Sequence, residues 1–306
     1  MTNSKFRVSI IIPTLNAENK IHNLISSLQK QSQDIFEIIV IDSSSTDRTF
    51  SIVKELGCKV SVIDRINFRH GATRNLGAGI AQGDIFVFLT QDIIPLNYYF
   101  LSNLISPIVS GKASASMARQ IPNQNANPIE KFSRFYNYGT QSTVRSIKDN
   151  KKNGLRNYFF SNSASAYEKN AFLKVGGFDN DIIAIEDMDI CARLILSNHS
   201  VAYQADSIVI HSHNLNSSQL FRRYFDTGVY HNRKKFLLNN LQRDNEGKKY
   251  IFIGTKYLIE KRKYFWLLRF FWENYIKWLA FNLGLLNNFL PKFLKKHFSN
   301  VKHYWN

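Results

Sequence analysis

The chain of 306 residues is poor in cysteine, proline and methionine, with two, six and three of each. The cysteines, Cys58 and Cys191, are far apart and show no Cys-x-x-Cys spacing. A disulfide framework is therefore excluded as an organising feature. We expect a reducing, cytoplasmic setting in which both thiols are buried and inert.

Long apolar segments are also missing. A membrane-spanning helix requires about 18 consecutive apolar residues. The uncharged run 93–111 contains Pro95 and Pro107, and the run 278–291 is too short and carries three asparagines. The first residues, MTNSKFRVSIIIP, place no long apolar run before a small-residue cleavage site, so we expect no signal peptide. Attachment to a membrane surface fits this pattern better than spanning does.

Acidic residues are fewer than basic ones, 23 against 40, which gives a net charge of +17 at pH 7. Such an excess predicts an anionic partner. It is concentrated in residues 246–306, where 12 Lys and Arg stand against 3 Glu among many aromatic residues. A nucleic-acid-binding protein is one alternative, but no recognised motif is present, and the basic residues accompany apolar helices rather than a stacking groove. We therefore expect no nucleic acid among the partners.

The first third of the chain alternates short apolar runs with amphipathic segments. The runs predict strands at 8–12, 37–41, 59–63 and 84–89, and the segments between them predict helices at 20–31, 46–56 and 72–81. This order predicts an α/β fold with a parallel sheet covered on both faces. Ligands bind such sheets at the carboxyl ends of the strands, where this sequence places Thr14, Asn16, Asp42 and the Thr90–Asp92 segment.

The rest of the chain is less regular. We expect helices at 128–144, 168–175 and 187–197, with a Lys-rich flexible loop at 146–153 between the first two. After about Ser217 the pattern predicts helices only.

Two acidic residues lie at and after the end of the second expected strand. Asp47 opens a helix, and capping of free backbone N–H groups explains it best. Asp42 is the last residue of its strand, where a ligand would lie, and its carboxylate could accept the N3–H of a pyrimidine base.

Arg74 begins the helix that follows the third strand, although no GxGxxG or Walker pattern surrounds it. An arginine at a helix start suits a diphosphate, and a plain surface arginine is the alternative. Asp92 closes the run FVFLTQD, where a single carboxylate could hold Mg²⁺ or Mn²⁺ together with substrate phosphates.

A second acidic group opens the helix at 187–197. Glu186 and Asp187 could act on a substrate or serve only as partners of the helix dipole. His211 and His213 follow a short strand, where alternate residues share one face. They could bind a cation, or they could be two unconnected surface histidines.

Four segments resemble glycosyltransferase family 2, whose fold is called GT-A. They are SIIIPTLNAENKI, EIIVIDSSSTDRT, FRHGATRNLGAGIAQGDIFVFLTQD and VGGFDNDIIAIEDMDICAR, and they stand in the family's order over about residues 6–215. The HGATRN and TQD parts look most like the rhamnosyltransferase branch of bacterial surface-polysaccharide synthesis.

The resemblance implies a Rossmann-like, mostly parallel sheet flanked by helices. Residues 1–215 would form the catalytic domain, with a nucleotide-sugar half at about 1–120 and an acceptor half at about 121–215. Residues 216–306 would form a helical, basic and aromatic extension at the membrane surface.

The resemblance also implies residue roles. The nucleotide sugar would be held by Pro13, Thr14, Asn16, Glu18, Asp42, Arg74, Gln91 and Asp92. A divalent cation, Mg²⁺ or Mn²⁺, would be bound by Asp92 with His211, or with His213 as the alternative. Gly177, Phe178 and Glu186 would border the acceptor, and Asp187 would be the catalytic base.

These roles imply an inverting glycosyltransferase that moves a sugar, with L-rhamnose from dTDP-rhamnose as the best candidate. The acceptor would be a saccharide or a lipid-linked saccharide, at the inner face of the plasma membrane. One residue departs from the family pattern, because Thr90 replaces the first acid of the metal-binding DxD motif. That departure supports the alternative of a catalytically inactive relative that binds or scaffolds polysaccharide, whereas the retained Asp92, Asp187 and His211 oppose it.

The segment 264–286 is almost wholly apolar or aromatic. Arg269, Glu273 and Lys277 recur every four residues and form one charged stripe on the expected helix. A helix this apolar must pack against something. Packing on the catalytic domain and burial among lipid headgroups are the two alternatives.

Overall fold

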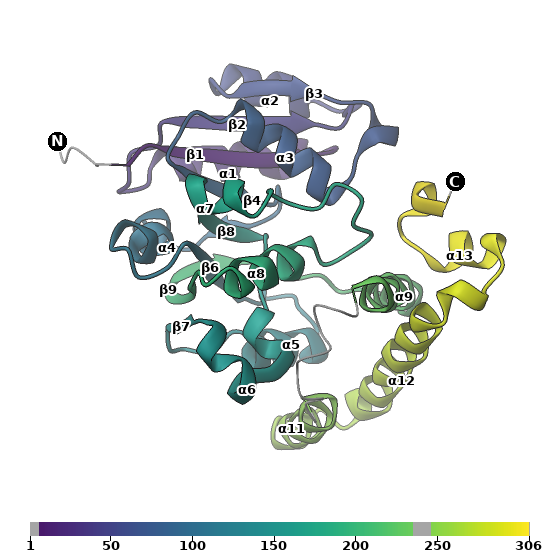
Figure 1. The fold of residues 1–306 in the computed structure, drawn as a ribbon. Coiled ribbons are helices and arrows are strands. Elements are labelled where there is room, and N and C mark those ends of the chain that lie inside the picture. The colour runs from purple at the N-terminus through teal and green to yellow at the C-terminus, as the bar shows by residue number, and fades with distance from the viewer. Residues whose placement is uncertain (1–5, 235–245, 306) are drawn as a thin grey trace.

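The computed structural model describes residues 6–234 and 246–305 and centres on one nine-stranded sheet (Figure 1). The strands lie in the order β3-β2-β1-β4-β8-β6-β9-β5, and β7 pairs with β9. Their bounds are β1 Val8–Thr14, β2 Glu37–Asp42, β3 Lys59–Val62, β4 Ile85–Leu89, β5 Ile94–Pro95, β6 Ala115–Ile121, β7 Thr143–Arg145, β8 Ala164–Glu168 and β9 Val201–Ile210.

The parallel part of the sheet is its amino-terminal half. Strands β3, β2, β1 and β4 pair in parallel, with Ile12 opposite Val40 and Ile10 opposite Val87. Strand β8 then joins β4 and β6 in antiparallel pairs, while β6 and β9 are parallel to one another. The carboxyl ends of β1, β2 and β4 therefore meet at one edge, as the sequence predicts.

Helices cover both faces of this sheet. On one face lie α1 (Glu18–Gln29), α2 (Thr49–Glu55) and α4 (Phe100–Val109), which bury Leu24 and Leu104 against strand residues such as Ile10. On the other face lie α3 (His70–Ile80), α7 (Lys169–Lys174) and α8 (Glu186–Leu196), packed over Ile11 and Phe88. Alternate residues of β1 thus serve opposite cores, as the period of a strand requires.

The carboxyl-terminal helices stand beside the sheet, from α5 (Pro128–Asn137) at the bottom of Figure 1 up along its right side. They are α9 (Ser217–Arg233), α11 (Glu246–Glu260), α12 (Phe265–Leu285) and α13 (Lys292–Phe298). Helices α9 and α12 cross at two glycines. A Cβ atom on Gly228 would lie 2.2 Å from the carbonyl oxygen of Phe281, and one on Gly284 would lie 2.2 Å from that of Phe225.

This helical region is packed against the loop that precedes α8. Ile182 and Ile183 share a buried cluster with Phe225 of α9, Ala280 of α12 and Trp305. A further cluster joins α5, α11 and α12. Packing on the catalytic domain is therefore confirmed for one side of α12.

Two expectations for the middle of the chain need correction, and one strand was not predicted. The helix expected at 128–144 ends at Asn137, because residues 143–145 pair with β9 as a short edge strand. The loop expected at 146–153 is helical, with Ser146 capping the turn at Ile147–Asp149 and a short helix, α6, at Asn150–Asn153. The sequence analysis also missed β6, whose small residues (ASMARQI) carry little strand signal.

Cys191 of α8 is buried, as expected, whereas Cys58, directly before β3, is only half-buried. Burial raises the pKa of the Cys191 thiol to about 12 and that of Cys58 to about 11, so both thiols are protonated near neutral pH. Among the described residues, no helix is both long and apolar enough to cross a membrane.

Candidate active site

Asp42 is held at the end of β2 by three hydrogen bonds. The Thr14 hydroxyl donates to Oδ1 at 3.0 Å, and the backbone N–H and hydroxyl of Ser45 donate to Oδ2 and Oδ1 at 2.8 and 2.6 Å. The residue is 2% exposed. Two carboxylate oxygens offer about four acceptor positions, so the fixed carboxylate retains capacity for one more donor. This arrangement suits recognition of a base N–H, which remains a prediction.

The loop after β1 is tied to the start of α2. Asn16 lies in the left-handed region with φ 48°, and its Oδ1 accepts from the backbone N–H of Thr46 at 2.9 Å. The Glu18 carboxylate accepts from the backbone N–H of Arg48 at 3.0 Å. Asp47 accepts from the N–H of Thr49 at 2.9 Å, which confirms its capping role. Asn16 and Glu18 thus shape the loop that follows the half-buried Pro13 and the buried Thr14 at the end of β1.

Gln91 fixes the same loop from the side of β4. Its Oε1 accepts from the backbone N–H of Leu15 at 2.8 Å, and its Nε2 donates to the Leu15 carbonyl at 3.0 Å. The side chain therefore holds the Pro13–Asn16 loop against the end of β4. Contact of the nucleotide with Gln91 itself remains a prediction.

Arg74 lies inside the protein. Its residue is 4% exposed, and Nη1 donates to the Glu186 carboxylate at 3.0 Å and to the His70 carbonyl at 3.0 Å. The alternative of a surface arginine is therefore wrong. Burial is the largest effect and raises the pKa of Glu186, but the charges of Arg74 and His70 together with hydrogen bonding lower it, and the net shift is downward. The guanidinium thus helps to keep Glu186 ionised at the head of α8.

Asn75 and Gly71 hold the loop that leads to α8. The Asn75 amide donates to the Phe178 carbonyl at 2.7 Å and accepts from the Phe178 N–H at 2.9 Å. A Cβ atom on Gly71 would lie 2.2 Å from the carbonyl oxygen of Asp179, so only glycine permits this approach. The HGATRN segment therefore supports the loop at 177–180, a role that the sequence analysis missed.

Asp187 is half-buried at the first turn of α8. Its Oδ1 accepts from the N–H of Met188 at 2.9 Å, and its Oδ2 accepts weakly from the N–H of Asn162 at 3.4 Å. Burial, and next the negative charge of Glu186, raise the pKa of Asp187 to about 7. A carboxylate with this pKa can accept a proton near neutral pH, which is the property of a general base.

Asp92, His211 and His213 form a compact group of possible metal ligands. One ligand atom from each lies within 4.8 Å of the others. The Nε2 atoms of the two histidines are 3.0 Å apart, and they lie 3.5 and 3.4 Å from the Asp92 carboxylate. Burial raises the pKa of Asp92, but hydrogen bonding and charge from His211 lower it well below its usual range. The two histidines share one site and are not unconnected surface residues.

Gln120 orients His211 through the ring nitrogen that faces away from Asp92. Its Oε1 accepts a hydrogen bond from Arg134 and lies 2.9 Å from His211 Nδ1. Since this oxygen is an acceptor, the neutral form of His211 carries its proton on Nδ1, and its Nε2 lone pair is then available to a cation. The donor set therefore fits a divalent cation. Gln120 and Arg134 lie in parts of the chain for which the sequence offered no metal-site signal.

The acid at α8 and the Asp92 group are joined by the segment 161–163. Gln120 Nε2 donates to the Ser161 hydroxyl at 2.8 Å, and Asn162 contacts Asp187. The Thr90 N–H donates to the Ser163 carbonyl at 3.0 Å, and the Thr90 hydroxyl is buried next to Asp92. The predicted base and the predicted metal ligands are therefore connected through this segment.

The acceptor residues need one correction. Phe178 is 2% exposed and packs against Phe88 and Phe172, with ring centroids 5.0 and 5.2 Å apart. Its ring therefore offers no surface to an acceptor, and a role of Phe178 next to the acceptor through its backbone remains a prediction. Gly177, with φ 65°, forms the turn above the Phe172 ring, and a role next to the acceptor remains a prediction.

Known sequences with the same pattern include enzymes of cell-surface assembly. The family model for Glycosyl transferase family 2 matches residues 9–176. The O-antigen chain rhamnosyltransferase WbaN of Salmonella anatum is 37% identical over 305 residues, which cover 97% of this chain and 95% of that protein. The O-antigen chain rhamnosyltransferase RfbN of Salmonella typhimurium is 35% identical over 98% of this chain and 96% of that protein.

Solved structures show the same fold at low identity. The mannosyltransferase PcManGT from Pyrobaculum calidifontis, in complex with GDP-Man and Mn²⁺, superimposes with a TM-score of 0.59 at 17% identity, over 99% of this chain and 86% of that one. The S. aureus TarS structure in complex with UDP gives a TM-score of 0.55 at 18% identity, over 82% and 70%. The chain therefore has the GT-A fold.

Proposed function

This chain belongs to glycosyltransferase family 2, and on that premise we propose that it is an inverting rhamnosyltransferase of surface-polysaccharide synthesis. The donor is dTDP-L-rhamnose, and the acceptor is a saccharide hydroxyl. Near-complete alignment with two O-antigen rhamnosyltransferases supports the sugar. The nucleotide lies over the Pro13–Asn16 loop, with Asp42 accepting the N3–H of the base.

The reaction is a single displacement at the anomeric carbon. Asp187 accepts the proton of the acceptor hydroxyl while the hydroxyl oxygen bonds to the anomeric carbon from the face opposite the leaving group. The bond between that carbon and the diphosphate oxygen breaks, and dTDP departs with the electron pair. The position of Asp187 carries this assignment: its half-buried carboxylate is fixed at the first turn of α8 by the Met188 N–H at 2.9 Å, next to the ionised Glu186. Burial and the Glu186 charge raise its pKa to about 7, which suits a base near neutral pH.

We assign Arg74 to the support of Glu186 rather than to the diphosphate. The buried pair at 3.0 Å fixes the first turn of α8 and keeps a negative charge next to Asp187. Repulsion from that charge contributes to the raised pKa of Asp187. Glu186 thus acts on the acceptor through Asp187.

Asp92, His211 and His213 would hold a divalent cation, whose chemistry there is to offset negative charge on the departing diphosphate. Two imidazoles and one carboxylate suit Mn²⁺ better than Mg²⁺, which prefers oxygen ligands. We therefore propose Mn²⁺ as the activating ion. Metal-stripped protein should bind Mn²⁺ more tightly than Mg²⁺ by calorimetry, and His211→Ala should weaken that binding.

We place the reaction at the inner face of the plasma membrane, where the acceptor saccharide is carried on a lipid. The basic and aromatic helices after Ser217 support this location, since they combine the two features that hold peripheral proteins on anionic lipid. The acceptor sugar and the linkage are to be identified by screening.

The test is transfer with defined donors. The protein is incubated with Mn²⁺, a saccharide acceptor panel and dTDP-rhamnose, UDP-sugars or GDP-sugars in parallel, and release of nucleoside diphosphate is measured. We expect release and product only with dTDP-rhamnose, and NMR of the product should show the anomeric configuration opposite to that of the donor. Use of UDP- or GDP-sugars with dTDP-rhamnose ignored would refute the donor, and retained configuration would refute the mechanism.

A further inference from the structure

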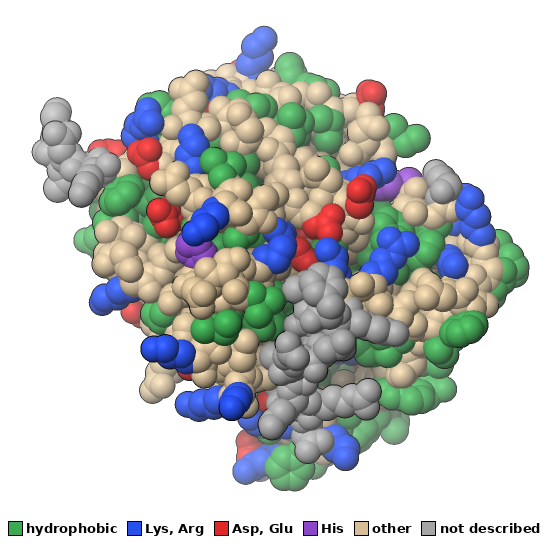
Figure 2. All heavy atoms as spheres, in the orientation of Figure 1, with side chains coloured by type: hydrophobic (Ala, Val, Ile, Leu, Met, Phe, Trp, Pro, Cys, Tyr) green, Lys and Arg blue, Asp and Glu red, His purple; other side chains and the backbone are tan. Residues whose placement is uncertain are grey.

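The helices at the carboxyl-terminal side expose an unusual amount of apolar surface. Thirteen of the 28 exposed large hydrophobic residues lie in residues 246–305, about a fifth of the described chain. Figure 2 shows hydrophobic side chains gathered along the lower right edge, over α11 and α12. Monomeric soluble proteins rarely leave large apolar patches uncovered without a binding function. We call this surface the outer face; six of its residues expose between 62% and 86% of their area, namely Phe252, Phe265, Leu268, Trp278, Phe289 and Phe293.

Helix α12 turns Glu273 and Lys277 inward, and several of its large apolar residues face outward. Glu273 is 6% exposed and bonds Arg269 at 2.8 Å, one turn away. The Lys277 ammonium lies 5.5 Å from the ring centroid of Tyr250 of α11. On the opposite side of the same helix, Leu268 is 78% exposed and Trp278 is 62% exposed. Helices at a protein–water boundary normally place apolar side chains toward the protein and charged side chains toward the water.

Basic residues border the outer face at both ends. The turn between α11 and α12 contains Lys261, Arg262 and Lys263, all exposed, and α13 begins with exposed Lys292. Tyr275 and Trp278 of α12, with ring centroids 6.3 Å apart, lie in the exposed stripe between these ends. Tryptophan and tyrosine favour the headgroup level of a bilayer, and lysine and arginine favour anionic lipid.

We propose that the outer face of α11, α12 and α13 docks on an anionic lipid bilayer. The proposal deepens the proposed function, on which the lipid-linked acceptor rests. A second copy of this chain would also cover apolar surface, but a rim of like positive charges opposes self-association and matches anionic headgroups. The apolar side chains enter the headgroup region, and the lysines at the two ends meet lipid phosphates.

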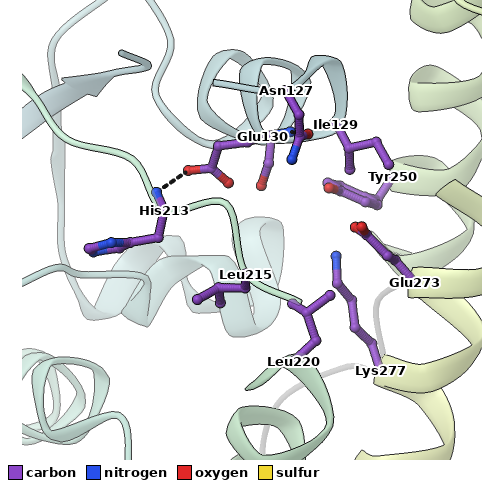
Figure 3. A pocket seen from close by; sticks show the side chains of 10 residues that line it. Asn127, Ile129, Glu130, His213, Leu215, Leu220, Tyr250, Glu273 and Lys277 are labelled. Atoms are coloured by element: carbon purple, nitrogen blue, oxygen red, sulfur yellow. Dashed lines mark hydrogen bonds between the residues drawn. The ribbon is translucent and has the colours of Figure 1, made fainter. Parts of the chain in front are cut away.

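The inner side of α12 faces the active site. Glu273 and Lys277 line a cavity of about 50 Å³ together with Tyr250, Glu130 and His213 (Figure 3). The side chains of Glu130, Glu273 and Lys277 point into this space in the close-up view, and the His213 N–H donates to Glu130 at 3.3 Å. His213 also belongs to the proposed metal group.

Docking through the outer face therefore brings the metal group close to the bilayer. One helix separates the lipid surface from the cavity next to His213, and a helix with its side chains is about 10–12 Å across. The outer face thus sets the height of the active site above the membrane.

The test is flotation of the full chain with vesicles of phosphatidylcholine alone or mixed with phosphatidylglycerol. We expect binding to the mixed vesicles and at least tenfold weaker binding to phosphatidylcholine. A face variant, Phe265→Ser with Leu268→Ser and Phe293→Ser, should bind mixed vesicles at least tenfold more weakly than the parent. These positions are 82%, 78% and 69% exposed, so the fold should tolerate the changes.

A control variant carries the same chemical change on the far side of the molecule. Val62→Ser, Ile66→Ser and Leu173→Ser remove side chains that are 53%, 75% and 56% exposed and lie on β3, the turn after it and α7. The control should bind vesicles as the parent does. Equal binding by the face variant and the parent overturns the proposal, and so does equal loss in the control.

Two further measurements separate the alternatives. Light scattering without lipid should show that the parent is a monomer. If the parent is instead a dimer, the face variant is a monomer and the parent does not bind vesicles, then the outer face binds a second copy and the proposal is overturned. Transfer to a water-soluble saccharide should be the same in the parent and the face variant. If that transfer is absent while flotation succeeds, the proposed function fails and the membrane face stands.

Discussion

Removal of the Arg74 guanidinium distinguishes two roles for the HGATRN segment. The Nη1 atom lies 3.0 Å from the Glu186 carboxylate, and the two side chains are 5% and 11% exposed. The change Arg74→Met leaves Glu186 buried without its cation, which costs about 3–5 kcal/mol in comparable buried pairs. For a chain of this size, a loss of about 1 kcal/mol lowers the melting temperature by roughly 2–4 °C. We expect melting to fall by roughly 6–20 °C.

A double-mutant cycle isolates the pair. Glu186→Gln alone leaves the arginine buried and should also destabilise the protein, whereas the double variant removes both charges together. Its loss should therefore be smaller than the sum of the single losses, with a coupling free energy of about 2 kcal/mol. Denaturant midpoints of the four proteins, with the m-value unchanged, give this quantity.

Donor affinity provides the second readout. If Arg74 supports Glu186 and does not touch the diphosphate, the Kd of dTDP measured by calorimetry should stay within about threefold in the Arg74→Met protein below its melting transition. A contact with the diphosphate would be a charge-assisted pair worth roughly 1.5–3 kcal/mol, or more than tenfold in Kd. Normal melting together with a tenfold loss of dTDP affinity would refute the supporting role and restore the prediction made from sequence.

Asp187→Asn should reduce the transfer rate by about 10²–10⁴ with dTDP affinity unchanged, whereas the control Asp181→Asn, which changes an exposed side chain in front of α8, should leave transfer normal. The activity of the parent should rise with pH through about 7, because only the ionised Asp187 accepts a proton. Burial raises the pKa of Asp226 to about 7 in the folded protein. As the pH rises from the unfolded pKa of about 4 toward 7, only the unfolded protein ionises this group, so the folded protein loses stability. Asp226→Asn should therefore be more stable to denaturant than the parent at pH 8, by at most about 4 kcal/mol, and should show no such gain at pH 4. Gly228→Ala should lower the melting temperature by several degrees because its Cβ meets the Phe281 carbonyl, whereas Gly247→Ala, in open space on α11, should leave it unchanged or raise it.

The sequence predicts the elements whose residues carry a strong periodic signal. The strands ending at Thr14, Asp42 and Leu89 are β-branched or aromatic runs, and the helices between them are amphipathic, so their order and the edge at which their ends meet follow from pattern alone. β6 is built from small and polar residues that become strand only because β8 and β9 pair with it on both sides. Tertiary pairing decided that segment.

The site residues divide in the same way. Asp42, Asp92 and Asp187 stand at strand and helix ends, where sequence order places them. Burial does not follow from order, so the inward position of Arg74 and the core position of Phe178 required the structure. Gln120 orients His211 across 91 positions of sequence, a separation that no local pattern reveals.

The cluster that joins Ile183 to Phe225, Ala280 and Trp305 has a consequence for the time course of synthesis. The loop in front of Asp187 is translated more than a hundred residues before the tryptophan that helps to cover it. At translation rates of about 5–20 residues per second, the interval is roughly 6–25 seconds. During that interval the strands of the donor half can already fold, while the apolar side chains of the loop stay exposed until the carboxyl-terminal residues that pack on them are synthesised. The nascent enzyme should therefore acquire the ability to bind nucleotide before it acquires the ability to transfer a sugar.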